Sequence, residues 1–139
     1  MYTLTKKFRF ESAHRLAKGY KGKCANIHGH SWNGSITIES AYGLDDQGML
    51  IDYAKIKKFT EKIEKELDHK LLLYNGDTKV LIRLCQSMEL EIKLFPNNST
   101  SEVIAEWIFD KARIHFPCDV YIKSVTIEET CTTSCTYTG

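Results

Sequence analysis

Three long stretches of alternating apolar and polar residues, with three amphipathic stretches between the second and the third, most constrain how this 139-residue chain can fold. A period of two is typical of strands that bury one face, and it predicts strands over Leu4–Phe10, Ile27–Tyr42 and Val120–Glu129. Shorter alternating runs predict two further strands, at Glu89–Phe95 and Thr132–Thr138.

The amphipathic stretches repeat their apolar residues every three or four positions, which is the period of a helix with one buried face. Each begins at a residue type that caps helix N-termini. The expected helices run from an N-cap at Asp52 to Asp68-His69, over Thr78–Gln86, and from the capping box Ser99-x-x-Glu102 to just before Pro117.

Strands that surround helices in this order predict an α+β fold, an antiparallel sheet with helices on one face. The length predicts one domain over residues 1–139, and the chain contains no repeat or linker.

Composition excludes several classes of protein. The 19 basic and 18 acidic side chains nearly balance, and no basic-aromatic strand motif occurs, so a nucleic-acid binder is not expected. No apolar run approaches the roughly 20 residues that span a membrane. The first residues lack the apolar core of a signal peptide, and five cysteines cannot all pair within the chain. We therefore expect a cytoplasmic protein with free thiols.

Three histidines form the clearest candidate site. His28 and His30 are two residues apart on a predicted strand, so their side chains share a face. His14 ends the preceding strand, and a hairpin would place it beside them. Three protein ligands with one open position are typical of catalytic zinc. The alternative is that His28 and His30 are surface histidines of a loop around Gly29.

Other residues have both a chemical and an ordinary interpretation. Cys24, near several lysines, can be a base, a nucleophile or a fourth metal ligand, or only a small apolar residue. Asp68 can orient His69 for acid–base chemistry, or His69 can simply complement the end of a helix. Glu128, at a strand end, can bind a donor-rich heterocycle or be an exposed terminus.

Four basic side chains in nine residues can bind a phosphate-bearing ligand, although a solvated loop is the commoner explanation. They are Arg15, Lys18, Lys21 and Lys23.

Six short motifs, in order along nearly the whole chain, resemble the 6-pyruvoyltetrahydropterin synthase family. The motifs are Phe10–Leu16, Cys24–Ser31, Gly48–Tyr53, Leu67–Lys70, Thr100–Glu102 and Ile127–Thr130.

The C-terminal segment, with Cys131 and Cys135 after Glu129, resembles the bacterial branch that makes 6-carboxy-5,6,7,8-tetrahydropterin for 7-deazaguanine (queuosine) synthesis. Two features depart from that branch: Ser99 stands where proline is frequent, and the segment Leu71–Asn98 is longer than in the shortest relatives.

The resemblance implies the tunnelling fold, a four-stranded antiparallel sheet with helices on one face. It also implies assembly into a trimeric barrel, two barrels stacked as a homohexamer, and active sites between subunits. The implied reaction converts 7,8-dihydroneopterin triphosphate to 6-carboxytetrahydropterin, acetaldehyde and triphosphate.

The resemblance further implies a role for each matching residue. Zinc is expected on His14, His28 and His30. The general base is Cys24, with His69 as the partner acid–base and Asp68 holding its tautomer. The family motif puts the pterin carboxylate immediately before threonine, which selects Glu129 over Glu128, and Thr100 and Glu102 assist it.

Two alternatives stay open at this point. One is a 6-pyruvoyltetrahydropterin synthase, which eliminates triphosphate without breaking a carbon–carbon bond. The other is a noncatalytic zinc-stabilised binding module, in which Cys24 closes the metal site as a fourth ligand.

Overall fold

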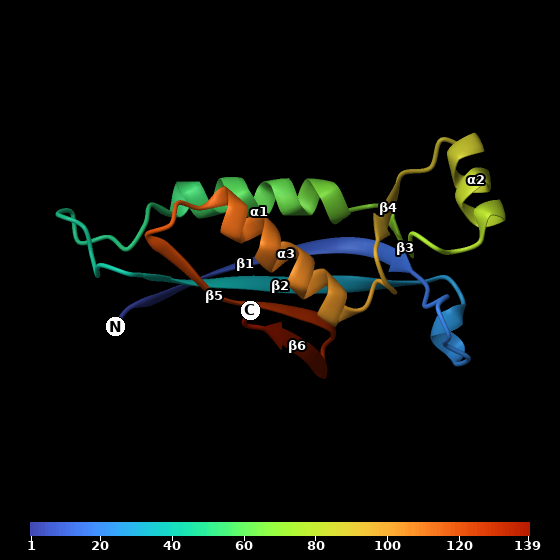
Figure 1. The fold of residues 1–139 in the computed structure, drawn as a ribbon, viewed down its shortest axis with the longest axis horizontal. Helices are drawn as coiled ribbons and strands as arrows, with labels where there is room; N and C mark the ends of the chain where they lie inside the picture. The colour runs from blue at the N-terminus through green and yellow to red at the C-terminus, as the bar shows by residue number, and fades with distance from the viewer.

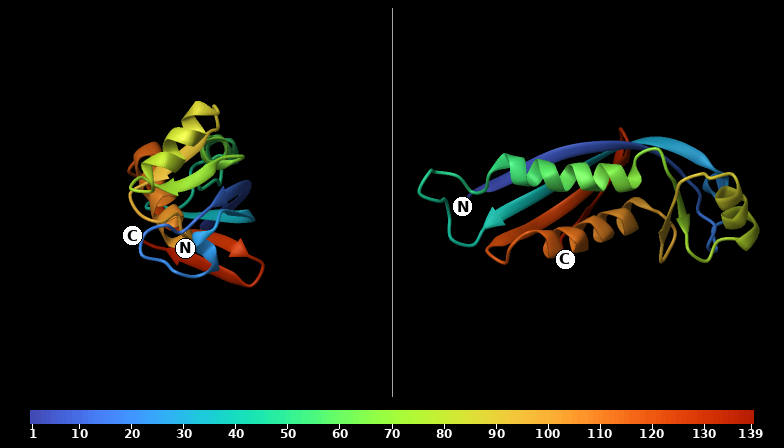
Figure 2. Two further views of the ribbon diagram at one scale, coloured as in Figure 1. Left: turned by 90° about the vertical axis from the view of Figure 1, so that its right-hand side faces the viewer. Right: turned by 90° about the horizontal axis from the view of Figure 1, so that it is seen from above.

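The structure, a computed structural model, describes residues 1–139 and contains one six-stranded sheet. The strands lie in the order β4-β3-β1-β2-β5-β6, and the long helices α1 and α3 cover one face (Figures 1 and 2). The strands are β1 (Thr3–His14), β2 (His28–Ser40), β3 (Leu71–Tyr74), β4 (Ile92–Phe95), β5 (Val120–Thr130) and β6 (Thr133–Tyr137). The helices are α1 (Tyr53–Leu67), α2 (Lys79–Ser87) and α3 (Ser101–His115), with a 3-10 turn at Lys23–Ala25.

The antiparallel part of the sheet confirms the expected fold class. Strand β1 pairs with β2 from Thr3–Glu39 to His14–His28, so the last pair of this ladder consists of two histidines. Strand β5 pairs with β2 and with β6, again antiparallel. These four strands are the ones implied by the family resemblance.

The count of four strands is wrong for the whole sheet, because β3 and β4 extend it. Both run parallel to their neighbours, β3 beside β1 and β4 beside β3. Strand β3 has the sequence Leu-Leu-Leu-Tyr, and its two central residues are buried. A short continuous apolar run has no period of two, so it gives no strand signal of its own.

The helices begin where cap residues predict, with one correction. Asp52 caps α1 by accepting a hydrogen bond from the Ala54 amide, 2.8 Å away. The capping box predicts Ser99 as the N-cap of α3, but the N-cap is Thr100. Ser99 is instead buried, and its hydroxyl donates to the Leu72 carbonyl at 3.0 Å. Ser99 thus joins the start of α3 to the sheet.

The core lies between the helices and the sheet face that they cover. Alternate residues of the central strands point into it, including Phe10, Trp32 and Ile36, all at most 1% exposed. No helix is both long and apolar enough to cross a membrane.

Candidate metal centre

The three predicted histidines come together at the end of the β1–β2 hairpin. His14 and His28 are facing partners in the register, and His30 faces Ser12. Their ring centroids are 4.6 to 5.1 Å apart. All three rings lie on the helix-covered face of the sheet, just beyond the buried Trp32, whose indole packs edge-on against His14 and His30.

Glu129 is the fourth member of this cluster. Strand β5 places it on the same face as the buried Ile127, as the period of two requires, whereas Glu128 is exposed on the other face. Its Oε1 lies 3.1 Å from Nε2 of His14 and 3.3 Å from Nε2 of His30. One ligand atom from each of the four residues lies within 4.8 Å of all the others.

Main-chain carbonyl groups fix the tautomers of two rings. Nδ1 of His14 is 2.8 Å from the Ser99 carbonyl oxygen, and Nδ1 of His28 is 2.7 Å from that of Asn26. A carbonyl oxygen only accepts hydrogen bonds, so both Nδ1 atoms carry the proton. In the neutral form of such a ring Nε2 carries the lone pair, and the two Nε2 atoms lie 3.1 Å apart. Histidines that bind metals are oriented in this way.

The cluster has the chemistry of a metal site. Nε2 of His30 is buried without a hydrogen-bond partner. Burial lowers the pKa of both His14 and His30, which favours the neutral rings that metals need. A cation between the four groups would satisfy every one of them, and imidazole with carboxylate suits zinc, copper, iron or nickel.

The Asp68–His69 pair is formed as predicted but lies elsewhere. Nδ1 of His69 is 2.6 Å from Oδ2 of Asp68, while Oδ1 of Asp68 accepts the Glu11 amide at 2.8 Å. That amide, together with the His69 hydrogen bond, lowers the pKa of Asp68. The amide of His69 also donates to the Glu11 carbonyl at 2.7 Å. Strand β1 thus holds the pair at the end of α1, with a carboxylate ready to stabilise a charged ring.

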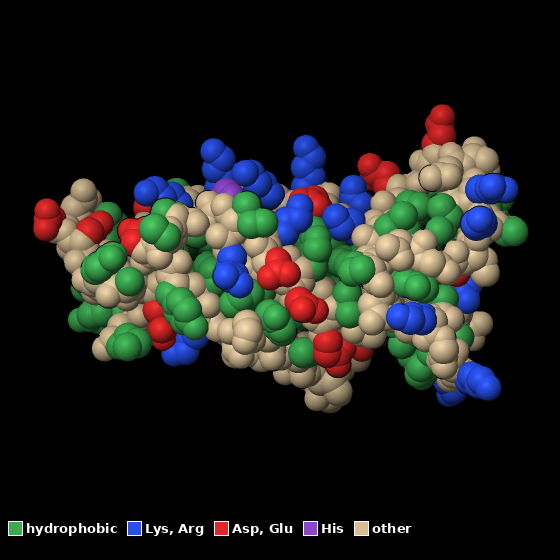
Figure 3. Space-filling model, viewed as in Figure 1, with side chains coloured by type: hydrophobic (Ala, Val, Ile, Leu, Met, Phe, Trp, Pro, Cys, Tyr) green, Lys and Arg blue, Asp and Glu red, His purple; other side chains and the backbone are tan.

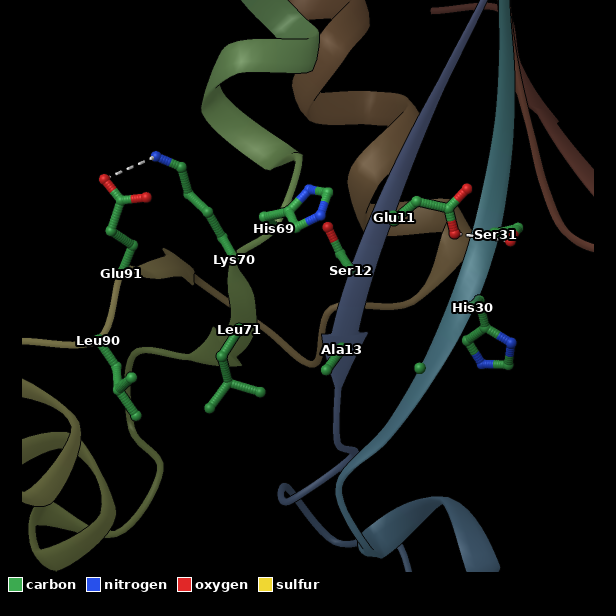
Figure 4. A pocket seen from close by; sticks show the side chains of 11 residues that line it. Glu11, Ser12, Ala13, His30, Ser31, His69, Lys70, Leu71, Leu90 and Glu91 are labelled. Atoms are coloured by element: carbon green, nitrogen blue, oxygen red, sulfur yellow. Dashed lines mark hydrogen bonds and ion pairs between the residues drawn. The ribbon is translucent and has the colours of Figure 1, made fainter. Parts of the chain in front are cut away.

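The His69 ring opens onto a groove of about 640 Å³, which Lys70, Leu71 and Leu90 also line. Figure 4 shows His69 on one side of β1, and the ring of His30 beyond β2, pointing away from it. No hydrogen bond or ion pair joins His69 to the histidine cluster. His30 also lines this groove, but its ring and that of His69 point in different directions, and no contact joins the acid–base pair to the histidine cluster.

Cys24 lies in the loop that joins β1 to β2, in the 3-10 turn, and is half-buried. The loop is closed by a hydrogen bond from the Leu16 amide to the Cys24 carbonyl at 2.8 Å. The charge of a Cys24 thiolate, and its hydrogen bond, raise the pKa of the Tyr20 phenol. Cys24 is not a member of the cluster of possible ligands, whose fourth member is Glu129. All five cysteines are free thiols.

Thr100 and Glu102 lie at the start of α3, next to the Ser99 carbonyl that orients His14. The Thr100 hydroxyl accepts a hydrogen bond from the Val103 amide at 3.4 Å. The amide of Glu102 itself, with the Thr100 and Ser101 hydroxyls, lowers the pKa of the Glu102 carboxyl. Glu102 in turn contributes to the raised pKa of Cys135 on β6, which is caused mainly by burial.

Sequence reasoning missed the groups that orient the ligands. The carbonyls of Ser99 and Asn26 belong to the main chain, so no side chain signals them. The sequence analysis also gave Glu129 only the role of binding the pterin ring. The strand period that places Glu129 beside Ile127 could have indicated that this carboxylate shares a face with the histidines.

Comparisons with known proteins agree with this fold. The family model described as 6-pyruvoyl tetrahydropterin synthase matches residues 3–139. The 6-carboxy-5,6,7,8-tetrahydropterin synthase of Haemophilus influenzae is 30% identical over 99% of both chains. The enzyme of that name from Synechocystis is 33% identical, over 99% of this chain and 93% of its own.

A solved structure, the 6-pyruvoyl tetrahydropterin synthase of Caenorhabditis elegans, is 28% identical. It superposes with a TM-score of 0.72 over 99% of this chain and 95% of its own. The match of the family model over nearly the whole sequence, with the same fold, shows that the chain belongs to the 6-pyruvoyl tetrahydropterin synthase family.

Proposed function

We propose that this protein converts 7,8-dihydroneopterin triphosphate to 6-carboxy-5,6,7,8-tetrahydropterin, with release of acetaldehyde and triphosphate, as a step of 7-deazaguanine synthesis. The observation that carries the proposal is the cluster of His14, His28, His30 and Glu129 in a chain whose full-length relatives bear the name of this enzyme. The free thiols of the cysteines support a reducing compartment such as the cytoplasm.

Zinc is the metal that we propose for the cluster, held by His14, His28 and His30. Three imidazoles with a further position are a frequent catalytic zinc arrangement. When bound, zinc acts as a Lewis acid that acidifies substrate hydroxyl groups and stabilises the oxyanions formed from them. The Ser99 and Asn26 carbonyls keep the donor atoms of His14 and His28 directed at the ion.

Proton transfer is assigned to Cys24 and His69. Cys24 is the general base, and its thiolate would remove a proton from the side chain of the substrate. His69 is the partner acid–base; Asp68, hydrogen-bonded to its Nδ1, leaves Nε2 free to exchange a proton with the substrate. Because His69 and the metal cluster face different ways in one chain, we propose that a second copy of the chain completes each active site, within a dimer of trimers.

Glu129 is proposed to bind the pterin ring. A carboxylate accepts paired hydrogen bonds from the amino group and ring N–H of a pterin, which fixes the orientation of the ring. Thr100 and Glu102, at the nearby start of α3, are proposed to assist. Lys18, Lys21 and Lys23 of the loop between β1 and β2 are proposed to bind the triphosphate, whereas Arg15 faces the buried Asp77.

Product analysis tests the proposal. Purified, zinc-loaded protein is incubated with 7,8-dihydroneopterin triphosphate without oxygen, and the products are identified by mass spectrometry. We expect carboxytetrahydropterin with acetaldehyde. Pyruvoyltetrahydropterin, the product implied by the name of the family model, would keep the metal and base assignments and refute the carbon–carbon cleavage. No turnover with zinc bound would refute the proposed function.

A further inference from the structure

The carboxylate of Glu129 has two candidate partners: the pterin ring proposed above, and the metal. Its Oε1 lies among the Nε2 atoms of the histidines, 3.1 Å from that of His14 and 3.3 Å from that of His30. Within 4.0 Å, the only basic side chains that the Glu129 carboxylate meets are these two imidazoles; no lysine or arginine lies that close. The groups nearest the carboxylate are thus ligand atoms.

The distances match those expected between ligands of one ion. Zinc binds imidazole nitrogen and carboxylate oxygen at about 2.0–2.2 Å, so neighbouring ligand atoms of a tetrahedral site are about 3.3 Å apart. Three of the six separations are close to this value: 3.1 Å between the Nε2 atoms of His14 and His28, and 3.1 and 3.3 Å from Glu129 Oε1 to His14 and His30. All four ligand atoms lie within 4.8 Å of one another. Glu129 lies where the fourth ligand of such a tetrahedral site would be, the position that a catalytic site leaves open.

The strand geometry makes this position inherent to the fold. Glu129 follows the buried Ile127 on β5, whose pairing with β2 puts the carboxylate over the same face as His30. Its side chain remains 30% exposed, so solvent or a ligand can reach it and it has room to turn. The neighbouring Glu128 is exposed on the opposite face and cannot replace it.

We infer that Glu129 is the fourth ligand of the metal in the substrate-free protein, and that it leaves the metal for the pterin ring when substrate binds. The inference rests on the proposed function only for the pterin. A four-ligand site is closed, whereas catalysis needs an open position. Release of Glu129 opens that position only when a pterin is present to accept the carboxylate.

Metal binding tests the first half without any turnover. Zinc affinity is measured by competition with a chromophoric chelator for the wild type, Glu129→Gln and the matched control Glu128→Gln. We expect Glu129→Gln to weaken zinc binding about tenfold or more, and Glu128→Gln to leave it unchanged. Equal affinities for the two variants would overturn the inference. Circular dichroism checks that each variant is folded, and Glu129→Asp, which keeps a carboxylate, should retain part of the affinity.

Cobalt reports the coordination directly, because zinc has a filled d shell and no visible absorption. We expect the visible spectrum of the Co²⁺ protein to change in Glu129→Gln and not in Glu128→Gln. The probe for exchange is 7,8-dihydropterin, which has the ring but no side-chain hydroxyl to bind the metal. Saturating probe should move the wild-type spectrum toward that of Glu129→Gln and leave Glu129→Gln unchanged.

An unchanged wild-type spectrum with the ring bound, as measured by equilibrium dialysis, would overturn the exchange, and so would failure of the ring to bind. These outcomes are separate from those of product analysis. A protein that makes no carboxytetrahydropterin but shows the Glu129 dependence of metal binding would refute the proposed function and leave the ligand assignment intact.

Discussion

Two carbonyl oxygens decide the chemistry of the histidines. Ser99 and Asn26 accept the Nδ1 protons of His14 and His28, which leaves both Nε2 lone pairs facing the same point. Two lone pairs 3.1 Å apart repel each other unless a cation lies between them. A cation bound between two neutral rings would remove this repulsion.

Replacing a ligand tests this at the level of one residue. His28→Ala removes one Nε2 donor, so we expect the purified variant to lose bound metal and activity together. Metal content is measured by atomic absorption and activity by product formation. His115→Ala, at the far end of α3, is the control and should keep both. Retention of metal with full activity in His28→Ala would remove His28 from the site.

For Cys24→Ala, in contrast to His28→Ala, we expect metal binding to be retained while activity is lost. The thiol is proposed as a base and is no member of the metal cluster, so Cys24→Ala should keep its metal and fold. Loss of a general base typically costs about 10²–10⁴-fold in rate, and we expect the turnover number to fall accordingly. Steady-state kinetics on metal-loaded protein measure it. A wild-type rate would exclude Cys24 from the mechanism.

The sequence contained the ligands but not what orients them. His28 and His30 follow from the period of two on a strand, and Glu129 from the family motif and the same period. The carbonyl of Ser99 reaches His14 across 85 positions of the chain. No pattern of side chains encodes such a main-chain contact, because it depends on how β1, β3 and α3 pack.

Among the elements, those with a clear period and a cap were predictable. Helix α1 begins after Asp52 and ends at Asp68, as expected. Strand β3 was missed, since an apolar run of four residues between two parallel neighbours has no alternation to reveal it. The start of α3 was displaced by one residue, because Ser99 and Thr100 are both good caps and only the buried contact of Ser99 with Leu72 separates them.

An ion-pair network joins α1, β4 and α3. Glu66 lies 2.9 Å from both Lys93 and Lys111, whose ammonium groups lie over the Trp107 ring. Burial opposes ionisation of Glu66, but the hydrogen bonds and charges of the lysines outweigh it and lower its pKa. A lowered pKa in the folded state stabilises the protein at pH values above the ordinary glutamate pKa, and the effect disappears as pH falls through the lowered value.

We therefore expect Glu66→Gln to destabilise the protein at neutral pH, by about 1 kcal/mol or less because the pair is partly exposed. The difference from wild type should vanish in strong acid. Urea unfolding at several pH values measures it. A difference that grows as pH falls would contradict the sign of this pKa shift, and Glu61→Gln, on the exposed side of α1, is the control.

At the scale of the whole molecule, the proposed site would need groups from more than one chain. His69 and the metal cluster face different ways, and the sheet ends in two unpaired edges, β4 and β6. Unpaired edges are places where strands of another copy can add. Lysines gather over α1 on the helix-covered face, whereas apolar side chains are exposed around α2 (Figure 3). The face of α1 is thus well solvated, as expected for the outer surface of the proposed barrel.

Complementation tests whether two copies share a site. Cys24→Ala and His69→Ala should each be inactive alone, and should regain activity when co-expressed, because some sites then receive an intact Cys24 from one copy and an intact His69 from another. Sedimentation of the wild type should show a hexamer. A monomer at micromolar concentration, or no recovery in verified mixed oligomers, would contradict the shared site.

The pairing of His14 with His28 has a consequence for the loop between them. These residues are the last of β1 and the first of β2, so an ion that binds both fastens the two ends of the loop that carries Cys24. Removing the metal should therefore loosen the general base as well as remove the Lewis acid. Trypsin should then cut at Arg15, Lys18, Lys21 or Lys23 faster in chelator-treated protein, and an unchanged cleavage rate would show that the loop holds its shape unaided. A bound metal would then also stabilise the loop that carries Cys24.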